Sequence, residues 1–114
     1  MDNCIFCQIV EGKIPSEKVY EDDDILAFRD LYPAAPVHIL VIPKKHISSL
    51  LELQEEDQAL SGKILLGLQK VARQLGLDEK GFRVVNNTGS DGGQTVFHIH
   101  FHLLGGRELQ WPPG

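Results

Sequence analysis

Three histidines alternate with apolar residues near the C-terminus, in the run His98-Ile99-His100-Phe101-His102. Strict alternation predicts a β-strand, because successive side chains of a strand point to opposite faces of its sheet. We therefore expect the apolar residues of the run to face a core and the histidines to share the other face. Neighbouring histidines on a regular strand stand ~6–7 Å apart, and the outer two about 13 Å apart. That spacing is too wide for the three imidazoles alone to share a metal ion with ~2 Å bonds to nitrogen.

Length and composition predict one folded domain over residues 1–114. The chain is 42% hydrophobic and 24% charged, which is close to the average of globular proteins. Its formal net charge of -5 argues against a broad nucleic-acid or anionic-membrane surface, but one local pocket can still hold a small phosphorylated ligand. No apolar run approaches the ~20 residues that cross a bilayer, and no signal-peptide pattern opens the chain. We expect a soluble, cytoplasmic protein without nucleic-acid or membrane partners.

The hydrophobic pattern predicts an α+β fold, with an antiparallel sheet of about five strands, one long helix and one short helix. Apolar residues at helical spacing favour a short helix over 5–10 and a long helix over 60–75. Strands are expected over residues 19–20, 25–28, 37–42, 82–86 and 96–104. His38 is the one polar residue of its strand, so a buried histidine with satisfied hydrogen bonds is the default interpretation. If that strand pairs with the last one, His38 can also orient a histidine of the alternating run.

A glycine-rich polar loop, residues 87–93, is followed by Gln94 and Thr95 and leads directly into the histidine run. Glycines there allow backbone N–H groups to approach an anion closely. Imidazole acts as nucleophile, base or acid near neutral pH. Together the two features favour a catalytic, anion-binding site over a merely solvated stripe of histidines. Gln94 shares the parity of the histidine face if the strand starts early, whereas a contact from Thr95 requires a break in the regular pleat.

Cys4 and Cys7 are the two cysteines of the chain and form a Cys-x-x-Cys pair. They are either half-buried apolar side chains of the first helix, a redox pair, or half of a structural zinc site. A redox pair is less favoured, because no strand precedes the motif. Zinc takes four ligands, so two histidines would have to come from elsewhere. His46 follows two lysines after a strand and is by default a surface residue.

The segment from Gly92 to Leu103, with its three alternating histidines, resembles the signature of the histidine-triad (HIT) superfamily. Asp30 followed by Pro33-x-x-Pro36-x-His38, and then Val41-Ile42-Pro43-Lys44-Lys45-His46-Ile47, resembles the Hint branch of nucleotide-binding proteins. The tail Leu104-Gly105-Gly106-Arg107 with Trp111-Pro112-Pro113-Gly114 fits the same branch. The likeness covers nearly the whole chain and implies a HIT-like fold.

The resemblance implies hydrolysis of the P–N bond of purine nucleoside 5′-monophosphoramidates, which releases AMP or GMP and an amine. The central histidine, His100, is then the nucleophile and becomes nucleotidylated before water attacks, and no metal is required. The implied catalytic residues are His100, His102, His38, His98 and Thr95. The implied nucleotide-binding residues are Asp30, Asn87, Gln94, Ile5, Phe6, Ile9, Phe28, Leu31 and Trp111. The apolar residues in this set are equally well explained as plain core.

The resemblance also implies a structural zinc ion and a homodimer. Some HIT proteins bind zinc through residues that correspond here to Cys4, Cys7, His46 and His98. Hint proteins form two-fold dimers whose strands continue into a shared sheet, and the tail with Trp111 then lies near the partner's active site. Two other functions remain open at this point. One is a purine-nucleotide-binding regulatory or interaction protein with residual hydrolase activity. The other is a metal hydrolase that uses the histidine run, although no carboxylate ligand lies near that run.

Overall fold

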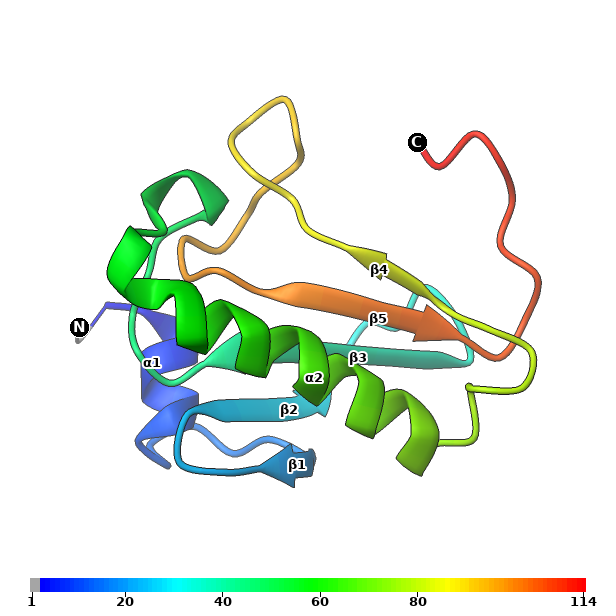
Figure 1. Cartoon of the computed structure of the whole chain (residues 1–114), viewed down its shortest axis with the longest axis horizontal. Coiled ribbons are helices and arrows are strands. Elements are labelled where there is room, and N and C mark those ends of the chain that lie inside the picture. The colour runs from blue at the N-terminus through cyan, green and yellow to red at the C-terminus, as the bar shows by residue number, and fades with distance from the viewer. Residues whose placement is uncertain (1–2) are drawn as a thin grey trace.

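A computed structural model describes residues 3–114. These residues form a five-stranded sheet in the order β1-β2-β3-β5-β4, in which every neighbouring pair is antiparallel. The elements are α1 (Ile5–Val10), β1 (Lys18–Glu21), β2 (Ile25–Arg29), β3 (Val37–Pro43), α2 (Gln58–Gln74), β4 (Arg83–Val85) and β5 (Phe101–Gly105). Two short 3-10 turns, Leu50–Glu52 and Glu55–Asp57, lead into α2. The predicted α+β class, antiparallel sheet and pair of helices are confirmed (Figure 1).

The long helix α2 runs across one face of the sheet (Figure 1). Burial of its apolar stripe against the strands drives this packing, at roughly 1.5–3 kcal/mol for each fully buried aliphatic side chain. The core on this side consists of Ile25, Ala27, Ile39, Val41, Ile64, Leu68, Val71, Ala72, Leu77 and Leu103. Phe101 packs against the same core. Phe101 and Leu103 therefore point toward α2, as the alternation predicts for the part of the run that forms a strand.

The short helix α1 covers the opposite face. Phe6 and Ile9 pack there on β2 and β3, in a second core with Leu26, Phe28, Leu40 and Ile42. The thiol of Cys4 caps the helix by accepting a hydrogen bond from the backbone N–H of Cys7 at 3.3 Å. Helices this short are marginal in isolation, so α1 owes its stability to these tertiary contacts.

The last strand is shorter than the alternation predicts. β5 begins at Phe101, and residues 96–100 approach it as irregular chain. The N–H of Ile99 donates to the carbonyl of Ile47, which follows β3, instead of joining a strand ladder. The strand expected over 96–104 is therefore wrong for its first half. His98, Ile99 and His100 are all buried, so in this part of the run the alternation of residue types does not correspond to the two faces of a regular strand.

Candidate functional site

The central strands β3 and β5 bring His38 and His102 together on the α1 face of the sheet. Nε2 of His38 lies 2.8 Å from Nδ1 of His102. The backbone N–H of Ala34 donates to Nδ1 of His38 at 2.9 Å, so His38 carries its proton on Nε2 and donates it to His102. This assignment leaves the proton of His102 on Nε2. The predicted pairing of the two strands, and the contact that it allows, are present.

His100 is oriented by a backbone carbonyl. Its Nδ1 lies 2.8 Å from the carbonyl oxygen of His98, and the ring is buried. Because a carbonyl only accepts, Nδ1 of His100 carries the proton and Nε2 keeps its lone pair. The ring centroid of His100 lies 5.2 Å from that of His102. The site thus holds an imidazole with a free lone pair beside an imidazole that offers an N–H, which suits nucleophilic attack assisted by hydrogen bonding.

Burial favours the neutral forms of His38 and His102. Burial, together with the smaller effects of the neighbouring His100 and His38, lowers the pKa of His102 to about 4. Burial also lowers the pKa of His38, against an opposing contribution from Asp30. Oδ2 of Asp30 lies 3.4 Å from Nε2 of His38, while Oδ1 accepts from the N–H of Tyr32 at 2.8 Å. Neutral rings can approach a phosphate without adding charge to the site.

The glycine-rich loop before the histidines is held by two side-chain amides. Nε2 of Gln94 donates to the carbonyls of Ser48 and Val96, at 2.8 and 3.1 Å, and its Oε1 accepts from the N–H of Gly89. Asn87 donates to the carbonyl of Gly92 at 2.6 Å. These two amides fix the shape of the loop through contacts within the chain. The side chain of Gln94 is buried, and its amide bonds to backbone groups of the loop and of Ser48.

The break in the pleat that Thr95 requires is present, because the chain bends before β5 begins. Thr95 is exposed and lines a cavity of about 420 Å³ together with Cys4, Ile5 and His46. The lining of this cavity includes neither His100 nor His102, so the exposed surface of Thr95 lies beside Cys4 and His46.

The predicted apolar binding residues divide into two groups. Phe6, Ile9 and Phe28 are at most 6% exposed and belong to the core beneath α1, where the rings of Phe6 and Phe28 meet edge to face at 5.6 Å. The others are accessible: Ile5 is 46% and Leu31 87% exposed. Trp111 is 79% exposed on the C-terminal tail. The sequence pattern alone did not separate these two groups.

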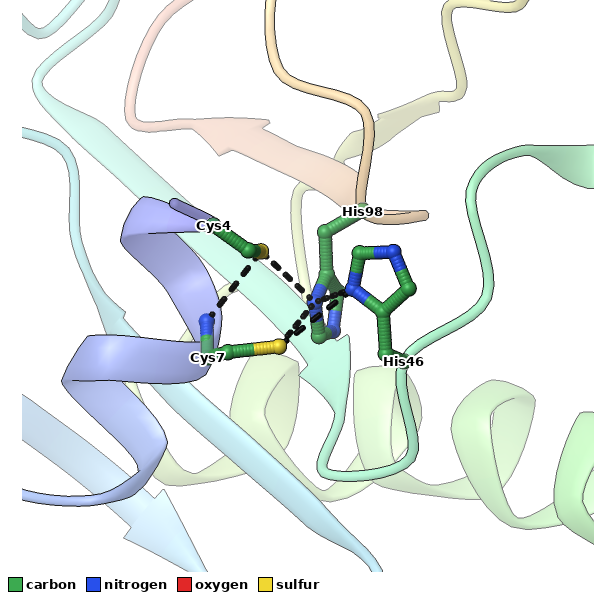
Figure 2. A group of neighbouring side chains, drawn as sticks. All are labelled: Cys4, Cys7, His46 and His98. Carbon is green, nitrogen blue, oxygen red and sulfur yellow. Dashed lines mark hydrogen bonds between the residues drawn. The ribbon is translucent and has the colours of Figure 1, made fainter. Parts of the chain in front are cut away.

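A second cluster joins Cys4 and Cys7 of α1 to His46, after β3, and His98, before β5 (Figure 2). Their four ligand atoms all lie within 4.8 Å of one another. Nδ1 of His98 is 3.4 Å from Sγ of Cys4 and 3.6 Å from Sγ of Cys7. Nδ1 of His46 is 3.3 Å from Sγ of Cys7 and 3.2 Å from Nδ1 of His98. His46 thus belongs to this cluster, which corrects its default interpretation as a surface residue.

These separations fit a tetrahedral metal site. Zinc bonds of ~2.0–2.1 Å to nitrogen and ~2.3 Å to sulfur place two nitrogens roughly 3.3 Å apart and nitrogen and sulfur roughly 3.5 Å apart. Nε2 of His98 donates to the carbonyl of Pro43 at 2.8 Å, which leaves the Nδ1 lone pair directed at the cluster. Burial, together with the smaller effect of the adjacent Cys4, raises the pKa of the Cys7 thiol to about 11. A bound cation would stabilise the thiolate in its place.

The overall likeness of the chain to known proteins agrees with this geometry. Residues 11–109 match the model of a protein family described as the HIT domain. The chain belongs to the HIT domain family. It is 58% identical to an uncharacterized HIT-like protein of Synechococcus elongatus, over 99% of this chain and 98% of the relative.

Two solved structures of HIT proteins share this fold. A HIT family hydrolase from Legionella pneumophila is 53% identical with a TM-score of 0.96, and the match covers 98% of this chain and all of the other. A histidine triad nucleotide-binding protein from Candida albicans is 37% identical with a TM-score of 0.81, over 89% of this chain and 73% of the other. Among residues 3–114, no helix of the HIT domain is both long and apolar enough to cross a bilayer.

Within the HIT domain, the three histidines of the alternating run do not act as one stripe. The imidazole of His98 lies in the cluster with Cys4, Cys7 and His46, whereas its backbone carbonyl contacts His100. Asn86, which sequence reasoning missed, donates to the carbonyl of His100 at 2.9 Å. A polar residue at the end of an apolar strand was the available signal. The backbone groups of Ala34 and Pro43 that bond to His38 and His98 leave no signal in the sequence. Every residue carries a carbonyl, and nearly every residue carries an N–H.

Proposed function

We propose that this HIT protein, as a single domain over residues 1–114, hydrolyses the P–N bond of purine nucleoside 5′-monophosphoramidates. The observation that carries the proposal is the order of protons through the histidines. Ala34 fixes the tautomer of His38, His38 fixes that of His102, and the carbonyl of His98 fixes that of His100. The result is a nucleophilic nitrogen on His100 beside an N–H donor on His102. The likeness to a HIT family hydrolase supports a hydrolytic reaction.

In the proposed reaction, Nε2 of His100 attacks phosphorus and the P–N bond to the leaving amine breaks. The departing amine takes a proton from the hydroxyl of Thr95 or from a neighbouring imidazole. The Nε2–H of His102 stabilises the charge on the phosphoryl oxygens. Water then attacks the nucleotidyl-histidine, which releases the nucleoside monophosphate and regenerates His100. The sum is one substrate and one water converted to one nucleotide and one amine.

The nucleoside is proposed to bind along α1 and the β2–β3 loop. Asp30 is only partly engaged by Tyr32 and His38, so its carboxylate can accept from both ribose hydroxyls. The accessible Ile5 and Leu31 would contact the base, above the buried Phe6, Ile9 and Phe28. Asn87 and Gln94 hold the loop whose backbone N–H groups would face the phosphate. The Candida albicans protein, described as nucleotide-binding, supports a nucleotide ligand.

We further propose that zinc occupies the cluster of Cys4, Cys7, His46 and His98 as a structural ion. Two thiols and two Nδ1 atoms at tetrahedral separations are the donor set that zinc prefers. Bound there, the ion would supply cross-linking of α1 to the segments after β3 and before β5. No step of the proposed hydrolysis uses it.

A homodimer is proposed through the sheet edge at β4. This strand lies at the edge of the sheet and leaves Phe82 and Val84 42% and 39% exposed. An unpaired apolar edge favours pairing with another chain. Arg83 holds the tail beside this edge by donating to the carbonyl of Gln110 at 2.9 Å. Trp111 then extends toward a partner bound at β4.

The proposed hydrolysis is tested with adenosine 5′-phosphoramidate and guanosine 5′-phosphoramidate. We expect product release by the wild type and none above background by His100→Ala. Acid-free quenching and mass spectrometry should find a nucleotidyl adduct that maps to His100 in the wild type alone. Equal amounts of product from the wild type and from His100→Ala would contradict the proposed hydrolysis at His100. Nucleotide binding without turnover by the wild type would instead favour a regulatory or interaction protein.

A further inference from the structure

We propose that the metal cluster positions His100, because one residue, His98, belongs both to the cluster and to the proposed active site. Its imidazole contributes Nδ1 to the cluster, and its carbonyl accepts from Nδ1 of His100 at 2.8 Å. Metal occupancy then sets the orientation of His100, and metal supply regulates turnover. The kinetic part of this inference rests on the proposed hydrolase function and zinc site, and its structural part does not require turnover.

The backbone at His98 is held by contacts other than those of a strand ladder. His98 lies three residues before the start of β5, so its carbonyl is outside the strand ladder. The peptide group that this carbonyl shares with Ile99 is held by the hydrogen bond from the Ile99 N–H to the carbonyl of Ile47, the residue next to His46 of the cluster. The imidazole is fully buried and held between the carbonyl of Pro43 and the cluster. Figure 2 shows His98 pointing from its own segment toward Cys4 and Cys7 of α1. A change in the cluster therefore acts directly on the residue whose carbonyl sets the tautomer of His100.

Helix α1 provides a second connection between the two sites. The ring of Phe6 meets the His100 ring edge to face at 5.1 Å and the His98 ring at 5.9 Å. Phe6 lies between Cys4 and Cys7 in sequence, on a helix of six residues. Such a helix has little stability of its own, so loss of its two cysteine anchors would loosen the packing of Phe6 on His100.

The cluster is also accessible enough for its occupancy to change. Cys4 is only partly buried, and Cys4 and His46 line the cavity of about 420 Å³ that opens beside the cluster. Chelators and small metal complexes can approach from this side without passing through the core. The four donors converge within 4.8 Å, so removing a cation leaves four buried or half-buried polar atoms without a shared partner.

The experiment compares metal-free and zinc-loaded protein with an NMR readout that needs no substrate. Long-range ¹H–¹⁵N spectra report the tautomer of His100, and hydrogen exchange reports the amides of α1 and of residues 98–100. We expect zinc to fix the Nδ1–H tautomer of His100 and to slow exchange in both segments. We expect chelation to reverse both changes and to lower kcat by about tenfold or more, with KM within about twofold, as a misplaced catalytic group does.

Three variants separate positioning from general stability. His46→Gln removes one ligand of the cluster while leaving His98 and its carbonyl in place, and should reproduce the metal-free spectra and kinetics even with zinc present. His46→Cys restores a four-ligand zinc set and should recover the wild-type His100 spectrum. Leu68→Ala, in the core beneath α2, lowers stability on the other face of the sheet and should leave the His100 spectrum unchanged.

Two results would overturn the inference. The first is a wild type that binds no metal by native mass spectrometry. The second is a His100 spectrum and exchange pattern that are identical with and without zinc. If the spectra respond to zinc as expected while no phosphoramidate is turned over, the positioning of His100 by the cluster stands and the proposed hydrolysis fails.

Discussion

His38 donates from Nε2 to Nδ1 of His102 across the β3–β5 pair at 2.8 Å, while its own Nδ1 accepts from the N–H of Ala34. His38 is therefore a residue that acts through His102. This role requires an N–H donor at the position of Nε2, which β3 holds beside His102.

Replacement of His38 tests this relay. His38→Ala removes the donor to His102 and should lower kcat for phosphoramidate hydrolysis by about 10²-fold, the usual contribution of one positioned acid or base. His38→Gln places an amide N–H near the position of Nε2 and should retain more activity than His38→Ala. Steady-state kinetics with circular dichroism as a folding control provide the measurement. Equal losses in the two variants would show that the donor at Nε2 is not what matters.

Stability should fall in mild acid because of His102. Burial lowers the pKa of His102 to about 4 from its ordinary value of 6.5, so the unfolded chain binds this proton more readily than the folded protein. The contribution of His102 is fully present above pH 6.5 and declines between pH 6.5 and 4, by less than about 1.4 kcal/mol per pH unit because the ring is half-buried. Urea unfolding of metal-free protein at several pH values measures the decline.

The matched variant for this pH dependence is His102→Gln. It cannot titrate, so its free energy of unfolding should fall less steeply than that of the wild type between pH 6.5 and 4. Parallel curves for the two proteins would assign the decline to other groups.

Removal of metal should lower stability. A ligand that binds the folded state alone adds ~2.7 kcal/mol at a free concentration one hundred times its dissociation constant. We expect zinc to raise the melting temperature of the wild type and a chelator to lower it. Cys7→Ser removes a buried cluster ligand and should make the melting temperature nearly independent of zinc. A zinc-dependent shift that persists in Cys7→Ser would place the ion elsewhere.

The loop before the histidines should not tolerate a side chain at Gly92. A Cβ there would overlap the backbone of Thr88, which cannot move without disturbing the turn that Gln94 holds. Gly92→Ala should therefore lower kcat/KM with a smaller effect on stability. Gly62→Ala is the matched control, because its Cβ would meet open space on α2 and should stabilise the helix by about 1 kcal/mol. Unchanged kinetics in Gly92→Ala would remove the loop from the proposed phosphate site.

The edge of β4 should control assembly. Val84→Glu puts a charge on the exposed apolar face of that strand and should shift the proposed dimer to monomer in sedimentation velocity. Leu51→Glu, at an equally apolar but distant surface site that is 80% exposed, should leave the sedimentation coefficient unchanged. A monomeric wild type, or a dimer in both variants, would contradict the proposed interface.

Side-chain periodicity was enough to predict the sheet, both helices and the face on which His38 and His102 meet. It could not show where β5 begins, because the alternation of residue types continues through His98 and His100, which lie on irregular chain where Ile99 between them is buried as well. Nor could periodicity distinguish Phe6 from Leu31, because both are apolar. Only the packing of the folded chain shows that Phe6 is buried and that Leu31 is exposed. The resemblance to a known family supplied the association of His46 with Cys4 and Cys7, which lie far from it in sequence.

The start of β5 at Phe101 gives the two adjacent histidines different mechanical attachments. His102 moves with the central pair of strands, the part of a sheet that opens least readily. His100 instead lies on irregular chain that is held by α1, by Ile47 and by the side chain of Asn86. The separation of the two rings therefore depends on contacts outside the strand ladder, so a substitution at Asn86 or Phe6 can shift His100 while His102 and the β3–β5 pair stay in place.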